Sequence, residues 1–240
     1  MNNQRGTFST RPQRRMAPAT QAIDASRSAF IRRTYLHVAG AILAFAGIET
    51  ALLNIPGIEK FAKSMTQGMT WLLVLGLFMG VAWGADRLAR STASVGLQYV
   101  GLGLFIIAEA VIFIPLLYAA ATFGEAGVIR TAGLVTMATV CGLTTFTFMT
   151  KTNFSWLLGI VVVGSFAAIG TVIAAVMFGF TLGVLFAGLM VLLAASIILY
   201  QTSALMYQWQ PDQHVAAALG LFSSVMLMFY YVLFFLMARD

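Results

Sequence analysis

Charged residues are scarce in this chain of 240 residues, at 9% of the total, whereas 60% of its residues are hydrophobic. A soluble globular domain carries roughly 25% charged residues. Long apolar runs continue over the whole length after residue 34. The composition therefore argues against a soluble domain and predicts an all-α, polytopic membrane protein.

Cysteine and histidine are also scarce, and this bears on enzymatic function. Cys141 is the single cysteine, so no intramolecular disulfide forms, and with two histidines no Cys/His zinc site is available. No lysine follows Lys151, which argues against a retinal protein. Neither His37 nor His214 lies deep enough in a span to activate Ser165 as a nucleophile. We expect no enzyme, no catalytic residues, no cofactor and no bound metal.

The net charge of +6 comes largely from the start of the chain, where seven of the fourteen basic residues lie within the first 33 positions. Positive charge beside a membrane helix sets its orientation, so we do not expect a nucleic-acid partner. Residues 1–28 are polar and predict a disordered, basic N-terminal tail. Residues 29–240 then form a transmembrane domain that contacts membrane lipids.

Seven apolar segments of about 20 residues, the length needed to cross a bilayer, follow the tail. The fifth and sixth are joined only by a short segment around Gly179, but their combined length requires two crossings. The predicted spans are 34–54, 69–86, 97–122, 128–149, 155–178, 181–206 and 215–237.

The distribution of basic residues favours a cytoplasmic N-terminus and an external C-terminus. In that orientation the tail, Arg87, Arg90 and Lys151 place ten basic residues inside. The outer loops receive four, which are Lys60, Lys63, Arg130 and Arg239. If the last segment were re-entrant, the C-terminus would return to the inner side.

The last span carries small side chains around most of its first half. Small residues gain nothing against lipid but allow neighbouring helices to approach closely. This span is therefore expected at the centre of the bundle, with the other six around it. The small residues are Ala216, Ala217, Ala218, Gly220, Ser223 and Ser224.

Two other stripes of small residues recur every four positions, which places each stripe on one helix face. We interpret them as sites of close intramolecular helix packing, with a homodimer seam as the alternative. The first comprises Gly76, Gly80 and Gly84, and the second comprises Gly179, Gly183 and Ala187.

Two acidic residues, Glu49 and Glu109, lie well inside apolar spans. A carboxylate is costly in hydrocarbon and often marks an ion or proton route. Counted from residues 34 and 97, the two lie roughly 22 and 18 Å along parallel helices, at one depth within the boundary error. Together they form a candidate ion or proton pathway. The alternative is that each carboxyl is protonated and makes structural hydrogen bonds.

Other polar residues receive structural interpretations. Pro115 is expected to kink the third span above Glu109 and to free a carbonyl there. Glu59, Lys60 and Lys63 are interpreted as the solvated face of a loop. Threonine hydroxyls of the fourth span line a wet path or bond back to the carbonyl one turn earlier, and we favour the second use. These threonines are Thr136, Thr139, Thr144, Thr145, Thr147 and Thr150.

Four sequence segments resemble the Bax inhibitor-1 family, the transmembrane Bax inhibitor motif group, in its bacterial YccA-like branch. The resemblance covers roughly residues 28–238. It implies a sandwich of six helices around a central seventh, which agrees with the small residues of the last span. The segments are Phe30–Leu36, Ile114–Tyr118, Leu199–Thr202 and Val215–Phe222.

The resemblance also implies a function. Family members are associated with a pH-sensitive calcium leak and with stress or cell-death responses, and bacterial relatives with a membrane-bound AAA protease. The leak depends on two aspartates, whose positions here hold Gln201 and Ser224, or its neighbour Ser223. Glutamine and serine cannot exchange a proton near neutral pH, so proton gating by this pair is expected to be absent.

Two functional hypotheses remain. The first is a regulatory or homeostatic protein of the cell inner (plasma) membrane, with a calcium, cation or proton pathway through Glu49 and Glu109. The second is a non-conducting interaction module that binds or modulates a membrane-bound AAA protease. A small-solute transporter is disfavoured because the sequence contains no convincing internal repeat.

Overall fold

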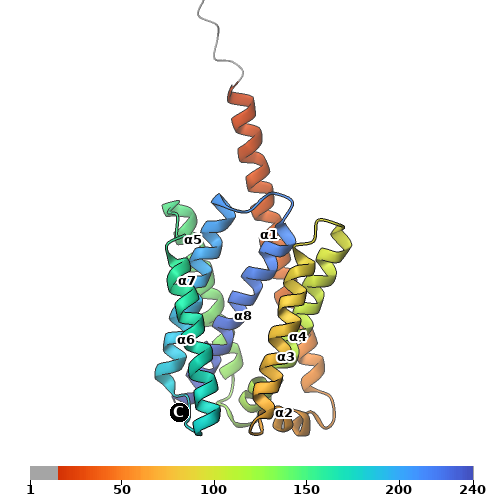
Figure 1. Ribbon diagram of the computed structural model, residues 1–240, viewed down its shortest axis with the longest axis vertical. Helices are drawn as coiled ribbons and strands as arrows, with labels where there is room; N and C mark the ends of the chain where they lie inside the picture. Colours follow the sequence, from red (N-terminus) through yellow and green to blue (C-terminus); the bar gives the residue numbers. More distant parts are fainter. Residues whose placement is uncertain (1–15, 240) are drawn as a thin grey trace, which may run out of the picture.

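The computed structural model describes residues 16–239, with side chains from residue 25 onward, and all regular secondary structure in this part of the chain is helical. The helices, labelled in Figure 1, are α1 (Met16–Leu53), α2 (Ile58–Thr66), α3 (Thr70–Ala89), α4 (Val95–Phe123), α5 (Val128–Thr150), α6 (Leu157–Phe178), α7 (Val184–Tyr207) and α8 (His214–Ala238).

Seven of these helices are long and apolar enough to cross a membrane, which confirms the predicted all-α, seven-span fold. The first span covers Ala25–Leu53, and the other six coincide with α3 to α8. The odd number of crossings places the beginning of α1 and the end of α8 at opposite ends of the bundle (Figure 1). Residues 1–15 of the predicted tail lie outside the described residues, whereas α1 begins at Met16.

The long apolar stretch from residue 157 to residue 207 is divided at Gly179. This glycine ends α6 in the left-handed region, with φ of 70°, a conformation that side chains with a Cβ rarely adopt. Its backbone N–H donates to the carbonyl of Ala175. The chain then reverses into α7, as the combined length of the two spans predicts.

The last helix lies inside the bundle. α8 packs against α1, α3, α4, α5 and α7, while α6 lies outside this group and packs on α7. The first half of α8 is almost completely buried, including Val215, Ala216, Ala218 and Phe222. The prediction of a central last helix is therefore confirmed, and small side chains permit the contacts that enclose it.

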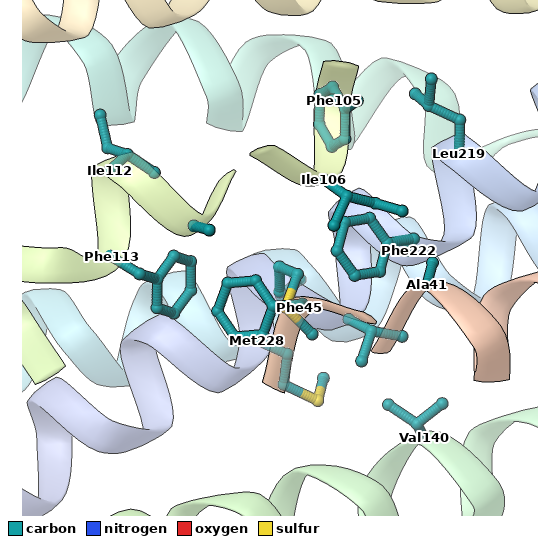
Figure 2. Packing of buried hydrophobic residues seen from close by; sticks show 14 of the residues in the cluster. Ala41, Phe45, Phe105, Ile106, Ile112, Phe113, Val140, Leu219, Phe222 and Met228 are labelled. Carbon is teal, nitrogen blue, oxygen red and sulfur yellow. The ribbon is translucent and has the colours of Figure 1, made fainter. Parts of the chain in front are cut away.

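The hydrophobic core is shared by α4 and α8. Among the spanning helices, α4 has the largest buried share of its most apolar segment. Phe222 on α8 contacts Phe45 on α1 and Phe105 on α4, with ring centroids 6.3 and 6.1 Å away. Figure 2 shows these rings together with Phe113 and Met228 in one cluster. Pro115 lies within α4 without ending it.

The segment after α1 contains a short helix, where the sequence predicted a loop. In α2, Ile58, Ala62 and Met65 are buried against α3 and α4, while Lys60 and Lys63 are exposed. The solvated face was identified, but the loop interpretation is wrong. A helix of only nine residues has too few turns for its hydrophobic periodicity to be recognised in the sequence.

The glycine stripe of α3 does not pack inside the bundle. At Gly76, Gly80 and Gly84, a Cβ would have no heavy atom within 4 Å, so the predicted intramolecular packing is wrong there. The close approach occurs at Gly101 on α4, where a Cβ would lie 2.5 Å from the carbonyl oxygen of Ala85.

The second stripe, at the α6–α7 boundary, behaves similarly. Ala187 is fully buried, but Gly179 and Gly183 have open space at the position of a Cβ. Four-residue spacing identifies a common face but not what that face contacts. A seam between two copies stays a hypothesis for both stripes.

Candidate functional site

Glu49 lies on the inner face of α1, one helical turn before that helix ends at Leu53. The residue is 4% exposed, and neither oxygen of its carboxyl has a hydrogen-bond partner in the described part of the chain. Buried polar groups in proteins are normally paired, and an unpaired one calls for an explanation. The burial of the Glu49 carboxyl without a partner therefore points to a function rather than to a structural role.

The carboxyl of Glu49 faces a cavity of about 300 Å³ between four helices. Thr136 on α5 lies in the wall of the same cavity, is 2% exposed, and likewise has no partner for its hydroxyl among the described residues. Apart from these two residues and Thr50, the wall is apolar, and it consists of Ile42, Phe45, Ala46, Leu53, Leu117, Ile129, Gly133, Met137, Val225, Met226 and Phe229.

Glu109 is also buried, at 6% exposed, but it is not part of this cavity. The rings of Phe45 on α1 and Phe113 on α4 lie 5.0 Å apart and set the register of the two parallel helices. Glu49 is one turn beyond that contact and Glu109 one turn before it. Their backbones are therefore about 12 Å apart along the helix direction.

The prediction that the two carboxyls lie at one depth is thus wrong. It counted the first span from residue 34, but this span begins at Ala25. Glu49 is consequently much farther along its helix than Glu109 is along α4. Both residues lie inside the bundle, but the structure does not bring them into one site.

Gln201 lies in the second half of α7, and Ser224 lies near the middle of α8. The carboxamide of Gln201 faces Gly220, where a Cβ would lie 3.5 Å from its Oε1. Ser224 is one turn farther along α8, and its hydroxyl donates to the carbonyl of Gly220 at 2.9 Å. Ser224 thus bonds within its own helix. Gln201 Oε1 is buried and has no partner in the described part of the chain.

A second cavity, of about 350 Å³, adjoins Gln201. Its walls contain amide side chains, including Gln208 and Gln213, and one charged residue, Arg90. Arg90 is paired with Asp86 at 2.7 Å. No acidic side chain is among the described residues that line this cavity, so it offers no carboxylate for proton exchange.

Three of the seven threonines of α5 bond back along their own helix, which is the use that we favoured. The hydroxyls of Thr139, Thr147 and Thr150 donate to carbonyls four residues earlier, at 2.8 to 2.9 Å. Thr144 instead accepts from the hydroxyl of Tyr35 at 3.5 Å. Thr136 differs from these residues because it faces the cavity of Glu49. No sequence signal marks Thr136, since it is one of seven threonines on α5.

Metal-binding clusters do not occur in the described part of the chain. Among residues 25–239, no group of three or more His, Cys, Asp or Glu side chains is arranged to hold a metal ion. A cation at Glu49 would therefore depend on one carboxylate and on neutral oxygens.

Two comparisons with known proteins point to the same family. A sequence family described as "Inhibitor of apoptosis-promoting Bax1" matches residues 27–240. A curated relative from Schizosaccharomyces pombe, called "Bax inhibitor 1", is 28% identical over 210 residues. This alignment covers 85% of the chain and 74% of the yeast protein. The match includes α3 to α8 and all but the first two residues of the first span, Ala25–Leu53.

Proposed function

This chain belongs to the Bax inhibitor-1 family of integral membrane proteins, and from that premise we propose that it is a regulatory or homeostatic protein with a cation leak pathway. The pathway would carry calcium or protons past Glu49 and Glu109. The observation that supports it is the position of Glu49. Its buried carboxyl faces a cavity and has no hydrogen-bond partner in the described chain. Intramembrane carboxyls in such positions often mark ion routes.

The proposed leak would differ from the family mechanism in its gate. Gln201 and Ser224 stand where the resemblance places two aspartates, and neither side chain exchanges protons near neutral pH. The hydroxyl of Ser224 bonds within its own helix. We therefore propose a leak that this pair does not gate by proton exchange.

A flux assay in liposomes tests the proposal. The full chain is reconstituted around a calcium-sensitive dye, and calcium entry is followed between pH 5 and 8. The variant Glu49→Gln/Glu109→Gln should lose the flux, whereas Glu59→Gln, a partly exposed acid on α2 outside the cavity, should keep it. Equal flux through the wild type and the double variant would exclude these carboxyls from the pathway.

The membrane and orientation also belong to the proposal. We place the chain in the YccA-like bacterial branch and in the cell inner (plasma) membrane, with a cytoplasmic N-terminus. The ten basic residues at that end, against four at the other, support this orientation. Labelling of single cysteines in intact and in opened cells would test it. The sites are Ser64→Cys, between α1 and α3, and Thr92→Cys, between α3 and α4.

The second candidate function is a non-conducting module that binds or modulates a membrane-bound AAA protease. It is favoured by the separation of Glu49 from Glu109, which leaves no joint acidic site. This candidate predicts no flux in either the wild type or the double variant. It also predicts that removing residues 1–15 or changing the loops weakens capture of the protease from solubilised membranes.

A further inference from the structure

The wall of the cavity beside Glu49 contains two polar groups without partners, the carboxyl of Glu49 and the hydroxyl of Thr136, which together indicate the chemistry of a ligand. Both side chains are more than nine-tenths buried, and neither finds a partner in the described chain. Burying such groups without hydrogen bonds costs about 1 to 3 kcal/mol for a neutral group and more for a charge. A molecule that supplies donors to Glu49 and Thr136 would remove this cost.

A bare calcium ion would not be retained in this cavity, although an ion in transit needs only weak, transient contacts. Calcium takes about six to eight oxygen ligands. The wall offers the carboxylate of Glu49 and the hydroxyls of Thr50 and Thr136, and Thr50 already donates to the carbonyl of Ala46 at 2.7 Å. The rest of the wall is hydrocarbon, aromatic ring or thioether. The ligand therefore needs an apolar part as well as a charge.

An alkylammonium group meets both requirements. Its N–H groups donate to carboxylate and hydroxyl oxygens, and charge-assisted bonds of this kind are stronger than neutral ones. The rings of Phe45 and Phe229 stand in the same wall, where a cation gains from a nearby aromatic face. The attached hydrocarbon would lie among Leu117, Val225 and Met226.

The entrance to the cavity lies between α1 and α5. α1 packs against α4, α7 and α8, but α5 is not among its extensive partners in the described structure. Ala46 and Thr50 on α1 and Met137 on α5 are lining residues that are also exposed. Since Glu49 is one turn from the end of α1, the entrance lies near the membrane–water boundary, where amphipathic molecules accumulate.

We propose that this cavity is a binding site for an amphipathic amine, which enters from the bilayer and places its ammonium group between Glu49 and Thr136. The same chemistry is available from a free hydrophobic amine and from the headgroup of phosphatidylethanolamine. The site does not require conduction, so it stands even if the leak proposal fails.

Titration calorimetry on the full chain in phosphatidylcholine nanodiscs tests the site, with n-hexylammonium as the probe and hexan-1-ol as its neutral counterpart. The wild type should bind the amine and not the alcohol. Glu49→Gln should weaken binding of the amine by about tenfold or more, because a charge-assisted bond is lost. Thr136→Val, which keeps the shape of the side chain, should weaken it by about threefold or more.

Matched variants control for general effects. Glu125→Gln removes an exposed acid at the same end of the bundle, and Thr139→Val removes a hydroxyl that bonds within α5. Both should bind like the wild type. Equal affinity of the wild type and Glu49→Gln, or equal binding of the amine and the alcohol, would overturn the proposal. Thr136→Val keeps the test decisive if Glu49→Gln does not fold.

Nanodiscs that contain phosphatidylethanolamine identify the source of the amine. If the lipid headgroup occupies the site, n-hexylammonium should bind the wild type more weakly in these nanodiscs than in phosphatidylcholine alone. The affinity of Glu49→Gln should be the same in both lipids. Unchanged affinity in the two lipids supports a free amine as the occupant. Absence of binding in both lipids overturns the site.

Discussion

His37 on α1 and His214, the first residue of α8, pack edge to face with ring centroids 5.1 Å apart. The Nδ1 of His37 lies 2.7 Å from the carbonyl oxygen of Arg33, which can only accept, so this nitrogen carries the hydrogen. The Nε2 then accepts from the hydroxyl of Tyr99 at 2.8 Å. The contact joins α1, α4 and α8 at the end of the bundle opposite Glu49.

Removing either imidazole should weaken this contact. His37→Ala and His214→Ala should each lower the temperature of thermal unfolding in detergent, because the ring contact and, for His37, the bond to Tyr99 are lost. Unchanged unfolding temperatures in both variants would show that the contact contributes little to stability.

Gly101→Ala should destabilise the crossing of α3 and α4. The new Cβ would lie 2.5 Å from the carbonyl oxygen of Ala85 and 2.6 Å from the backbone nitrogen of Ala89, so the helices must separate. Overpacking of this kind costs about 1 to 3 kcal/mol. Thermal unfolding of the purified protein measures the loss.

The matched control for this variant is Gly103→Ala, two positions along the same helix. A Cβ at this position would meet nothing within 4 Å, so the unfolding temperature should not fall. If both alanines lowered it equally, the close approach at Gly101 would not be the cause.

Ser203→Ala should loosen the connection between α5 and α6. The Ser203 hydroxyl, fully buried on α7, accepts the backbone N–H of Phe154 at 3.0 Å. Without it, a buried donor loses its partner at a cost of about 1 to 3 kcal/mol. Hydrogen exchange at Phe154 should accelerate. Ser196→Ala is the control, since that hydroxyl bonds within α7, to Leu192. Unchanged exchange at Phe154 would show that the bond contributes little.

Arg27→Gln should free the beginning of the first span from α7. The guanidinium donates to the carbonyl oxygens of Leu205 and Trp209, at 3.1 and 2.5 Å, where the end of α7 leaves carbonyls unpaired. Protease sensitivity of the segment before Phe30 should rise several-fold. The exposed neighbour Arg32 supplies the control, Arg32→Gln, which should leave cleavage unchanged. Equal cleavage of the two variants would argue against this anchor.

The spans and the central last helix could be predicted because hydropathy and side-chain size act locally. A run of about 20 apolar residues must cross the bilayer, and small residues around Ala217 suit a helix with neighbours on every side. The stripe at Gly76 failed because spacing reveals a shared face but not its neighbour. That neighbour is set by how α3 crosses α4, which depends on Gly101 and Ala85.

The candidate site was only partly visible in the sequence. Glu49 stands out as an acid among apolar residues, so its burial was predictable. Thr136, in the wall of the same cavity, lies 87 positions later on a helix with six other threonines. The relative depth of Glu109 was misjudged because it depends on where the first span begins. Tertiary packing decides both points.

The attachment of α6 has a practical consequence for handling the protein. This helix packs extensively only against α7 among the described helices, and very little of its most apolar segment is buried. Most of its surface therefore faces acyl chains, which are as apolar as the side chains of a protein core. Solubilisation replaces those chains with a micelle, so harsh detergents should detach α6 while the α4–α8 centre persists. Extraction with native lipids retained is the way to keep all seven spans together.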